Sequence, residues 1–289
     1  MTIEDAIRRA KKLGQARLQV QQDANPQRTS DSRIAAEPAQ SPSRPSSPAI
    51  RLDPLRTVEI SAEICAQHRV LLLESQLREF AAADAAYRLL RSRLQNRLKR
   101  NNWFSLAIAS PTQGDGKTVT ALNLAISIAR EKQKPVYVLD LDMRNPSVCK
   151  FLGIRDIQPL PDYFMGQAKP EDVLVQTSFP NLIVAGALGA TESASELLAG
   201  PGFSDLLAHI RLRSPDAFVL VDMPPVTMTD EALLIGPRVD AILVVVSEGK
   251  TERKYLSQTL STLGEFNVAG VVVNRSSESH MVGYEQYSA

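Results

Sequence analysis

The sequence predicts an α/β fold in which a parallel β-sheet is flanked by helices on both faces. From residue 103 onward, short apolar runs alternate with segments of helical periodicity, which is the pattern of strand–helix–strand units. The apolar runs are nearly continuous, as in strands buried on both faces of a sheet. Ligands of such sheets bind beyond the carboxyl ends of the strands, and the charged motifs of this chain lie there.

The predicted elements follow one another along the chain. Strands are expected at residues 104–109, 135–139, 182–185, 218–221, 241–246 and 268–273. Helices are expected at about residues 77–100, at 193–198, at 203–214 and at about 252–266. A further helix is expected to begin near residue 117. The helix at 77–100 combines an apolar stripe with a basic face. Residues 57–73 are ambiguous between helix and strand.

Composition divides the chain into four parts. Residues 1–22 place apolar residues at helical spacing opposite a basic face, which predicts an amphipathic helix. That helix either docks on a partner or an anionic membrane surface, or is a solvated arm. Residues 23–56 are rich in proline and serine and are predicted to be a disordered linker. A globular domain at 57–278 follows, with a flexible tail at 279–289.

Charge and cysteine content narrow the class of protein. The net charge of the 289 residues is +1, and its basic excess falls in the N-terminal arm and in residues 88–100. That excess suits acidic lipid, an acidic partner or nucleic acid. Cys65 and Cys149 are far apart, so we expect reduced thiols of a cytoplasmic protein. No signal peptide and no apolar run of about 18 residues is seen, so membrane association would need a partner.

The stretch after the first predicted strand, residues 109–118, is the strongest functional signal. It has the strand, glycine-rich turn, Gly-Lys-Thr and helix of a phosphate-binding loop, although Pro111 replaces the first glycine. Gly114 and Gly116 let the backbone aim N–H groups at phosphate. Lys117 is expected to reach the β- and γ-phosphates, and the Thr118 hydroxyl to bind Mg²⁺. The expected ATP contacts are Gln113, Gly114, Asp115, Gly116, Lys117, Thr118 and Val119.

Carboxylates at the ends of two later strands complete the predicted site. Asp222 ends an apolar strand and is followed by Met223 and two prolines, a position from which Asp holds Mg²⁺ directly or through water. Asp140 and Asp142 are two residues apart and face the same way in an extended chain. One of them could assist the metal while the other accepts a proton from an attacking hydroxyl. Arg144 could orient a carboxylate or bind phosphate.

Together these motifs resemble the bacterial tyrosine kinases of capsule and exopolysaccharide synthesis. That family has a P-loop, an apolar-Asp-x-Asp-x-Arg motif and an apolar-Asp-x-Pro-Pro motif. This chain supplies Lys117-Thr118, then Asp140, Asp142 and Arg144, then Asp222, Pro224 and Pro225. The resemblance covers roughly residues 80–275. The Asp-x-Asp-x-Arg motif is its most specific part, because it separates these kinases from most other P-loop ATPases.

The resemblance implies a fold related to the MinD/ParA ATPases and an ATP-dependent, autophosphorylating tyrosine kinase. Mg-ATP would be bound by Lys117, Thr118, Asp140 and Asp222, with Asp142 and Arg144 also catalytic. Asn274, which follows the last strand, would meet the adenine base. Phosphate would pass to the tail tyrosines, Tyr284 and Tyr287.

The resemblance also implies partners and a location. An inner-membrane polysaccharide chain-length (co-polymerase) protein would activate the kinase, and a tyrosine phosphatase would act in the same system. The chain would form a homo-oligomer and lie in the cytoplasm, recruited to the inner face of the membrane by its partner. DNA binding through residues 88–100 is not expected.

Three departures from the family pattern leave two other functions open. The tail has two tyrosines instead of a dense cluster, Ala85 replaces the glutamate of Glu-x-x-Arg-x-x-Arg before Arg88 and Arg91, and Met223 replaces a hydroxyl residue. One alternative is a MinD/ParA-type switch ATPase that transfers nothing to protein. The other is a non-catalytic, nucleotide-bound partner of a membrane polysaccharide assembly.

Overall fold

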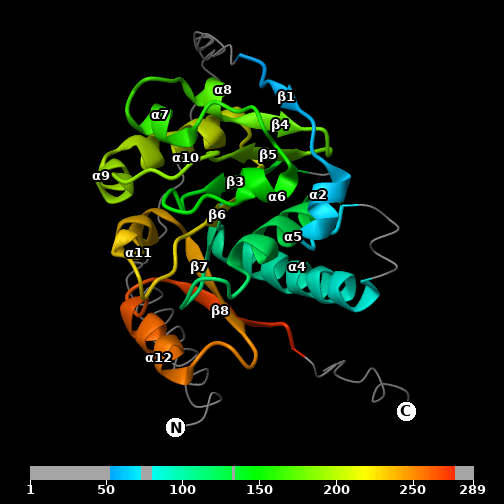
Figure 1. Ribbon diagram of the computed structural model, residues 1–289, viewed down its shortest axis with the longest axis vertical. Coiled ribbons are helices and arrows are strands. Elements are labelled where there is room, and N and C mark those ends of the chain that lie inside the picture. The colour runs from blue at the N-terminus through cyan, green and yellow to red at the C-terminus, as the bar shows by residue number, and fades with distance from the viewer. Residues whose placement is uncertain (1–52, 73–79, 132–133, 277–289) are drawn as a thin grey trace, which may run out of the picture.

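A single sheet of eight strands lies at the centre of the molecule, with helices on both of its faces (Figure 1). The computed structural model describes residues 53–72, 80–131 and 134–276. The predicted amphipathic helix at 1–22, nearly all of the predicted linker at 23–56 and the predicted tail at 279–289 lie outside these residues. Within them, the predicted sheet flanked by helices is confirmed.

The strands of the sheet are arranged in the order β1-β4-β5-β3-β6-β2-β7-β8. Their bounds are β1 Thr57–Val58, β2 Ser105–Ala109, β3 Val136–Asp140, β4 Val175–Thr177, β5 Leu182–Ala185, β6 Phe218–Asp222, β7 Ala241–Ser247 and β8 Val268–Asn274. All six predicted strands are present, with ends that differ by one residue at most. The five inner strands of this set match because each is a buried run of apolar residues. β8 matches although it lies at the edge of the sheet, where Val273 is exposed.

One edge of the sheet departs from the predicted parallel arrangement. β4 pairs with β5 in the antiparallel sense, while the other neighbouring strands are parallel. Only residues 178–181 separate β4 from β5, and so short a connection can join antiparallel strands but not parallel ones. Neither β4 nor β1 is predicted by the sequence, because strands of three and two residues carry too little periodicity.

Helices alternate with the strands. Their bounds are α2 Ala62–Gln67, α4 Ala81–Asn101, α5 Lys117–Ala129, α6 Val148–Leu152, α7 Leu160–Phe164, α8 Pro170–Val173, α9 Ala194–Ala199, α10 Gly202–Arg213, α11 Glu231–Ile235 and α12 Arg253–Thr262. A short 3₁₀ helix, η1, spans Gly236–Arg238. In the part of the chain described here, no helix has the length and apolar content that crossing a membrane requires.

Two apolar cores pack against the two faces of the sheet. α2, α4, α5 and α6 cover one face, and α7 and α9–α12 cover the other (Figure 1). The first core contains Cys65, Leu94, Leu122 and Leu152, and the second contains Leu160, Leu198, Leu206, Ile235 and Leu256. Burial raises the pKa of Cys65 to about 11 and that of Cys149 to about 12, so both thiols stay protonated.

Helix α5 lies at the middle of the first core. All of its residues are buried except Val119, which is half-buried. The helix contacts β2, β3, β5, β6 and β7 on one side and α4 on the other. Because β2 lies between β6 and β7, the loop that joins β2 to α5 emerges at the centre of the carboxyl edge of the sheet.

Residues 56–72 form an N-terminal strap that crosses this face. β1 adds to the edge of the sheet through β4, and α2 packs near α6. The strap ends on α5, where the Asn123 Oδ1 accepts the N–H of Leu71 at 2.7 Å and its Nδ2 donates to the carbonyl of Arg69 at 2.9 Å. Asn123 is buried, so it fixes the strap to the helix that carries the phosphate-binding loop.

The basic face of α4 is partly used inside the molecule. The Arg91 Nη1 donates to the carbonyl of Ser127 at 2.7 Å, and its Nε pairs with Glu131 at 3.1 Å. Arg97 donates to the carbonyl of Ala269 on β8. Two arginines of the basic face therefore fasten α4 to its neighbours, and are not simply solvated.

Candidate active site

The phosphate-binding loop spans residues 110–116, between β2 and α5. Gly114 and Gly116 have φ values of 77° and 99°, a conformation that favours glycine. No side chain caps the first turn of α5, so its N–H groups stay available. A helix N-terminus with free N–H groups and a positive dipole end is suited to bind phosphate.

Asp115 shapes the loop from within. Its Oδ2 accepts the Thr112 N–H at 2.8 Å and the Thr112 hydroxyl at 2.9 Å. Its Oδ1 accepts the Thr251 hydroxyl at 2.9 Å. The side chain is fully buried, and both of its oxygens accept hydrogen bonds. The predicted contact of Asp115 with ATP would therefore have to come from its backbone.

Asn274 lies at the end of β8, directly beside the loop. Its Nδ2 donates to the carbonyl of Asp115 at 3.0 Å. A Cβ on Gly116 would overlap the Asn274 amide, so the missing side chain of Gly116 makes room for this contact. The predicted contact of Asn274 with adenine stays a prediction, and the structure adds a role in supporting the loop.

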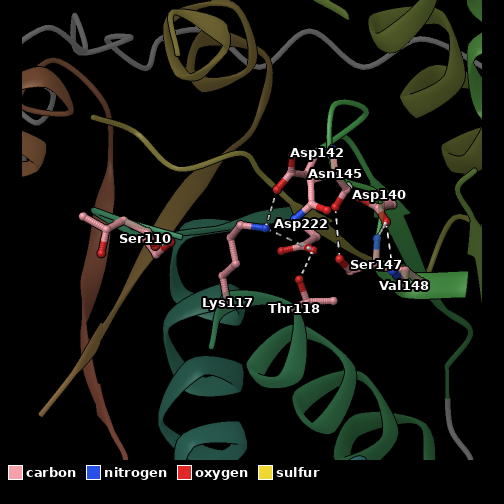
Figure 2. Close-up of polar contacts among 10 residues, drawn as sticks. Ser110, Lys117, Thr118, Asp140, Asp142, Asn145, Ser147, Val148 and Asp222 are labelled. Carbon is pink, nitrogen blue, oxygen red and sulfur yellow. Dashed lines mark hydrogen bonds and ion pairs between the residues drawn. The ribbon is translucent and has the colours of Figure 1, made fainter. Parts of the chain in front are cut away.

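The predicted lysine, threonine and carboxylates converge at one point. The Lys117 Nζ lies 2.6 Å from the Asp142 Oδ2 and 3.8 Å from the Asp222 Oδ2 (Figure 2). The Thr118 hydroxyl donates to the Asp222 Oδ2 at 2.6 Å. All four side chains are buried. Lys117 and Asp142 are 25 residues apart in the sequence, and Thr118 and Asp222 are 104 residues apart. The topology of the sheet brings them together, since β3 and β6 pair with Asp140 opposite Asp222.

Asp140 is anchored to the start of α6. Its Oδ2 accepts the N–H groups of Ser147 at 2.8 Å and Val148 at 2.9 Å, and its Oδ1 accepts the N–H of Asp142 at 3.2 Å (Figure 2). These bonds fix the carboxylate beside Asp222. They also hold the chain after β3 in a tight path around the site.

The site concentrates negative charge away from water. Burial and, after it, the nearby charge of Asp222 raise the pKa of Asp140 to about 7, although Lys117 and two backbone N–H groups act in the opposite direction. Burial also raises the pKa of Asp222. Burial alone would lower the pKa of Lys117, but Asp222 and Asp142 attract its proton and raise the pKa above its ordinary value. One ammonium group therefore faces three carboxylates.

The same residues fit a hard divalent cation. The Asp222 Oδ1 is buried and has no hydrogen-bond partner, and the Thr118 hydroxyl lies against the other oxygen of this carboxylate. An orphaned buried carboxylate oxygen beside a hydroxyl is the donor chemistry that Mg²⁺ prefers. The residues present thus fit the predicted ion.

Arg144 points away from this centre. Its Nε donates to the Glu231 Oε1 at 2.8 Å and its Nη2 to the Ser195 hydroxyl at 3.3 Å. A turn closed by the Asn145 N–H and the Asp142 carbonyl at 2.9 Å redirects the chain, so Arg144 does not continue the alternation of Asp140 and Asp142. Arg144 thus pairs with the carboxylate of the fully buried Glu231, while its predicted role in catalysis or phosphate binding stays a prediction.

The structure thus brings together Lys117, Thr118, Asp140, Asp142 and Asp222. Tyr284 and Tyr287 lie outside the described residues. Sequence reasoning missed Glu231, whose one signal is an acidic residue in an apolar helix. It also missed Lys250 and Thr251, which carry no motif and reach the loop from the turn after β7.

Comparison with known proteins agrees with this geometry. Residues 106–288 match the family described as the CobQ/CobB/MinD/ParA nucleotide binding domain. The chain is 26% identical over 214 residues to the tyrosine-protein kinase CpsD of Streptococcus agalactiae serotype Ia, covering 73% of this chain and 90% of CpsD. It is 25% identical over 203 residues to the tyrosine-protein kinase YwqD of Bacillus subtilis, covering 70% of this chain and 84% of YwqD.

Solved structures show the same fold. The kinase domain of VpsO is 26% identical, with a TM-score of 0.61, and the match covers 70% of this chain and 98% of that domain. The kinase domain of the Escherichia coli tyrosine kinase ETK has a TM-score of 0.63 at 24% identity, covering 79% of this chain and 94% of ETK's domain. The predicted resemblance to bacterial tyrosine kinases is confirmed. The chain belongs to the CobQ/CobB/MinD/ParA nucleotide-binding domain family.

Proposed function

We propose that this chain is an ATP-dependent protein tyrosine kinase that phosphorylates Tyr284 or Tyr287 of its own tail. The observation that carries the proposal is the contact of the loop lysine, Lys117, with Asp142, the second carboxylate of the Asp-x-Asp-x-Arg motif, at 2.6 Å. That contact supports the proposal, because it joins the lysine proposed to bind phosphate to a candidate proton acceptor. The similarity to proteins named tyrosine-protein kinase supports the same function.

The proposed reaction begins with an exchange of partners by Lys117. When the β- and γ-phosphates of ATP enter the loop, Lys117 turns to them and releases Asp142. The tyrosine oxygen attacks the γ-phosphorus, the bond from this phosphorus to the β–γ bridging oxygen breaks, and ADP leaves. Asp142 accepts the phenolic proton. Thr118, Asp140 and Asp222 would hold Mg²⁺, which supplies positive charge to the phosphates when bound.

We infer that the kinase regulates polymerisation and export of a surface polysaccharide. Its partners would be an inner-membrane chain-length protein as activator, a tyrosine phosphatase of the same system and further copies of this chain. The chain would act in the cytoplasm, at the inner face of the membrane. This part of the proposal rests on the resemblance to the kinases of capsule and exopolysaccharide synthesis.

The test is incubation of the full chain with γ-labelled ATP and Mg²⁺, followed by mapping of the label. We expect label on Tyr284 or Tyr287 that is lost in Lys117→Ala and Asp142→Asn. Lys134→Ala removes an exposed lysine paired with Asp216 and is the matched control, expected to keep the label. If the wild type stays unlabelled, the cytoplasmic part of a candidate activator is added.

Two results would contradict the kinase. Label found only outside the tail would remove the proposed acceptors. Steady release of free phosphate that depends on Lys117, without labelled protein, would instead identify a MinD/ParA-type switch ATPase.

A further inference from the structure

The turn that follows β7, residues 247–252, is rigidly built and faces the phosphate-binding loop. The carbonyl of Ser247 accepts the N–H groups of Lys250 at 3.2 Å and Thr251 at 2.9 Å. The N–H of Ser247 donates to the Thr251 hydroxyl at 2.8 Å, and Gly249 adopts a φ of 70°. The side chains of this turn are therefore presented in a fixed direction.

Two of these side chains contact adjoining parts of the loop. The Thr251 hydroxyl binds the buried Asp115 carboxylate, which ties the turn to the loop. The Lys250 Nζ donates to the carbonyl of Gln113 at 2.8 Å. It also lies 2.6 Å from where a Cβ on Gly114 would be, so a side chain at this position would displace the ammonium group.

The charge of Lys250 is uncompensated among the described residues. No carboxylate in residues 53–72, 80–131 or 134–276 forms an ion pair with it. The carbonyl of Gln113 takes one of its three N–H donors, and the side chain is exposed. Lys117, in contrast, is buried against Asp142 and Asp222. An exposed positive charge thus lies over a loop whose backbone is suited to bind anions.

We propose that Lys250 is a second phosphate-binding lysine of this site, which donates to the phosphates of the bound nucleotide. This inference rests on the proposed function in one respect, namely that the ligand is Mg-ATP. Lys250 adds a charge-assisted hydrogen bond and attraction at long range, while Lys117 serves the buried side of the same loop.

Titration calorimetry of the full chain with Mg²⁺ and the non-hydrolysable analogue AMP-PNP tests this role. We expect Lys250→Met to raise Kd about tenfold, or about 1.4 kcal/mol, since the variant loses a charge-assisted hydrogen bond to phosphate. Lys250→Arg should restore Kd to within about threefold of the wild type, because it keeps charge and donors. Lys254→Met removes an equal charge four residues away, from a lysine paired with Glu252, and should leave Kd unchanged.

A melting measurement separates phosphate binding from mere support of the loop. Thr251→Val breaks the tie to Asp115 and should lower the Tm of the nucleotide-free protein, whereas Lys250→Met should not. Equal Kd values for Lys250→Met and the wild type overturn the inference alone. A raised Kd together with a fall in Tm like that of Thr251→Val overturns it too, because Lys250 is then a clamp. Failure of the wild type to bind AMP-PNP overturns the proposed function as well.

Discussion

Asp222 shows how a single residue can favour function over stability. One of its oxygens accepts the Thr118 hydroxyl and lies 3.8 Å from the Lys117 Nζ, while the other is buried without a partner. A buried carboxylate without full compensation destabilises the nucleotide-free protein. The same orphaned oxygen is what makes the site receptive to a cation.

The substitution Asp222→Asn should stabilise the nucleotide-free protein at neutral and alkaline pH. Folding raises the pKa of Asp222 by burial, so the stability that its protonated form contributes is present at low pH and is lost as pH rises. Asn keeps the shape without the charge. We expect an advantage of about 1–3 kcal/mol at pH 8 that shrinks toward pH 4, measured by urea unfolding across pH.

Asp216→Asn is the control for this experiment. Asp216 is exposed and pairs with Lys134, so its substitution should give the same difference at every pH within about 0.5 kcal/mol. An Asp222→Asn variant that is less stable than the wild type at pH 8 would show that the carboxylate is well compensated.

Among the elements, helix α5 and the N-terminal strap depend on each other. The strap has only short regular segments, β1 and α2, and reaches α5 through the paired hydrogen bonds of Asn123. The Arg130 Nη2 adds bonds to the carbonyls of Leu71 and Leu72 at 2.7 and 3.0 Å. A segment that the sequence leaves ambiguous is thus ordered by side chains of another element.

Asn123→Ala should destabilise the protein by about 2–3 kcal/mol, because it leaves the buried N–H of Leu71 and the carbonyl of Arg69 without partners. Chemical denaturation measures the loss. Asn101→Ala removes an exposed side-chain bond to the Arg97 carbonyl and should cost less than about 0.5 kcal/mol. Equal effects of the two substitutions would mean that the strap is not held by Asn123.

For the molecule as a whole, the strap closes one side of the sheet. Three apolar side chains of the strap itself are buried in the core, namely Val58, Val70 and Leu71. The burial of each stabilises the fold by about 1.5–3 kcal/mol. The sum is comparable with the total stability of a domain, about 5–15 kcal/mol. The folded unit therefore begins well before the phosphate-binding loop.

Deletion of residues 1–72 should abolish cooperative unfolding or lower the Tm by more than about 10 °C, because the apolar face beneath the strap becomes exposed. Deletion of residues 1–52 removes none of the contacts described and is the control, expected to keep the Tm. Calorimetry of both truncated chains decides. A similar Tm for the two would place the start of the folded unit after the strap.

The sequence predicts the centre of this molecule better than its margins. Runs such as residues 241–246 are apolar because both faces are covered, and that local signal suffices for the inner strands. Lys117, Asp140, Asp142 and Asp222 are equally predictable, since strand ends and motif spacing position them.

Contacts between distant segments are what local patterns cannot predict. Thr251 reaches Asp115 across 136 positions, and Arg144 reaches Glu231 across 87. Asp115 lies within the phosphate-binding motif, but its side chain turns inward because it binds Thr112 and Thr251. β4 is likewise defined by its pairing with β5 and β1, not by its own three residues.

The burial of helix α5 on nearly every side has a consequence for motion. A helix packed against five strands and α4 has no low-energy way to open on its own, so it belongs to the part of the molecule that loosens only on global unfolding. Its N-terminus is then a fixed point during turnover. What moves as phosphate arrives and leaves must then be the side chains that face this fixed point, that of Lys117 first among them.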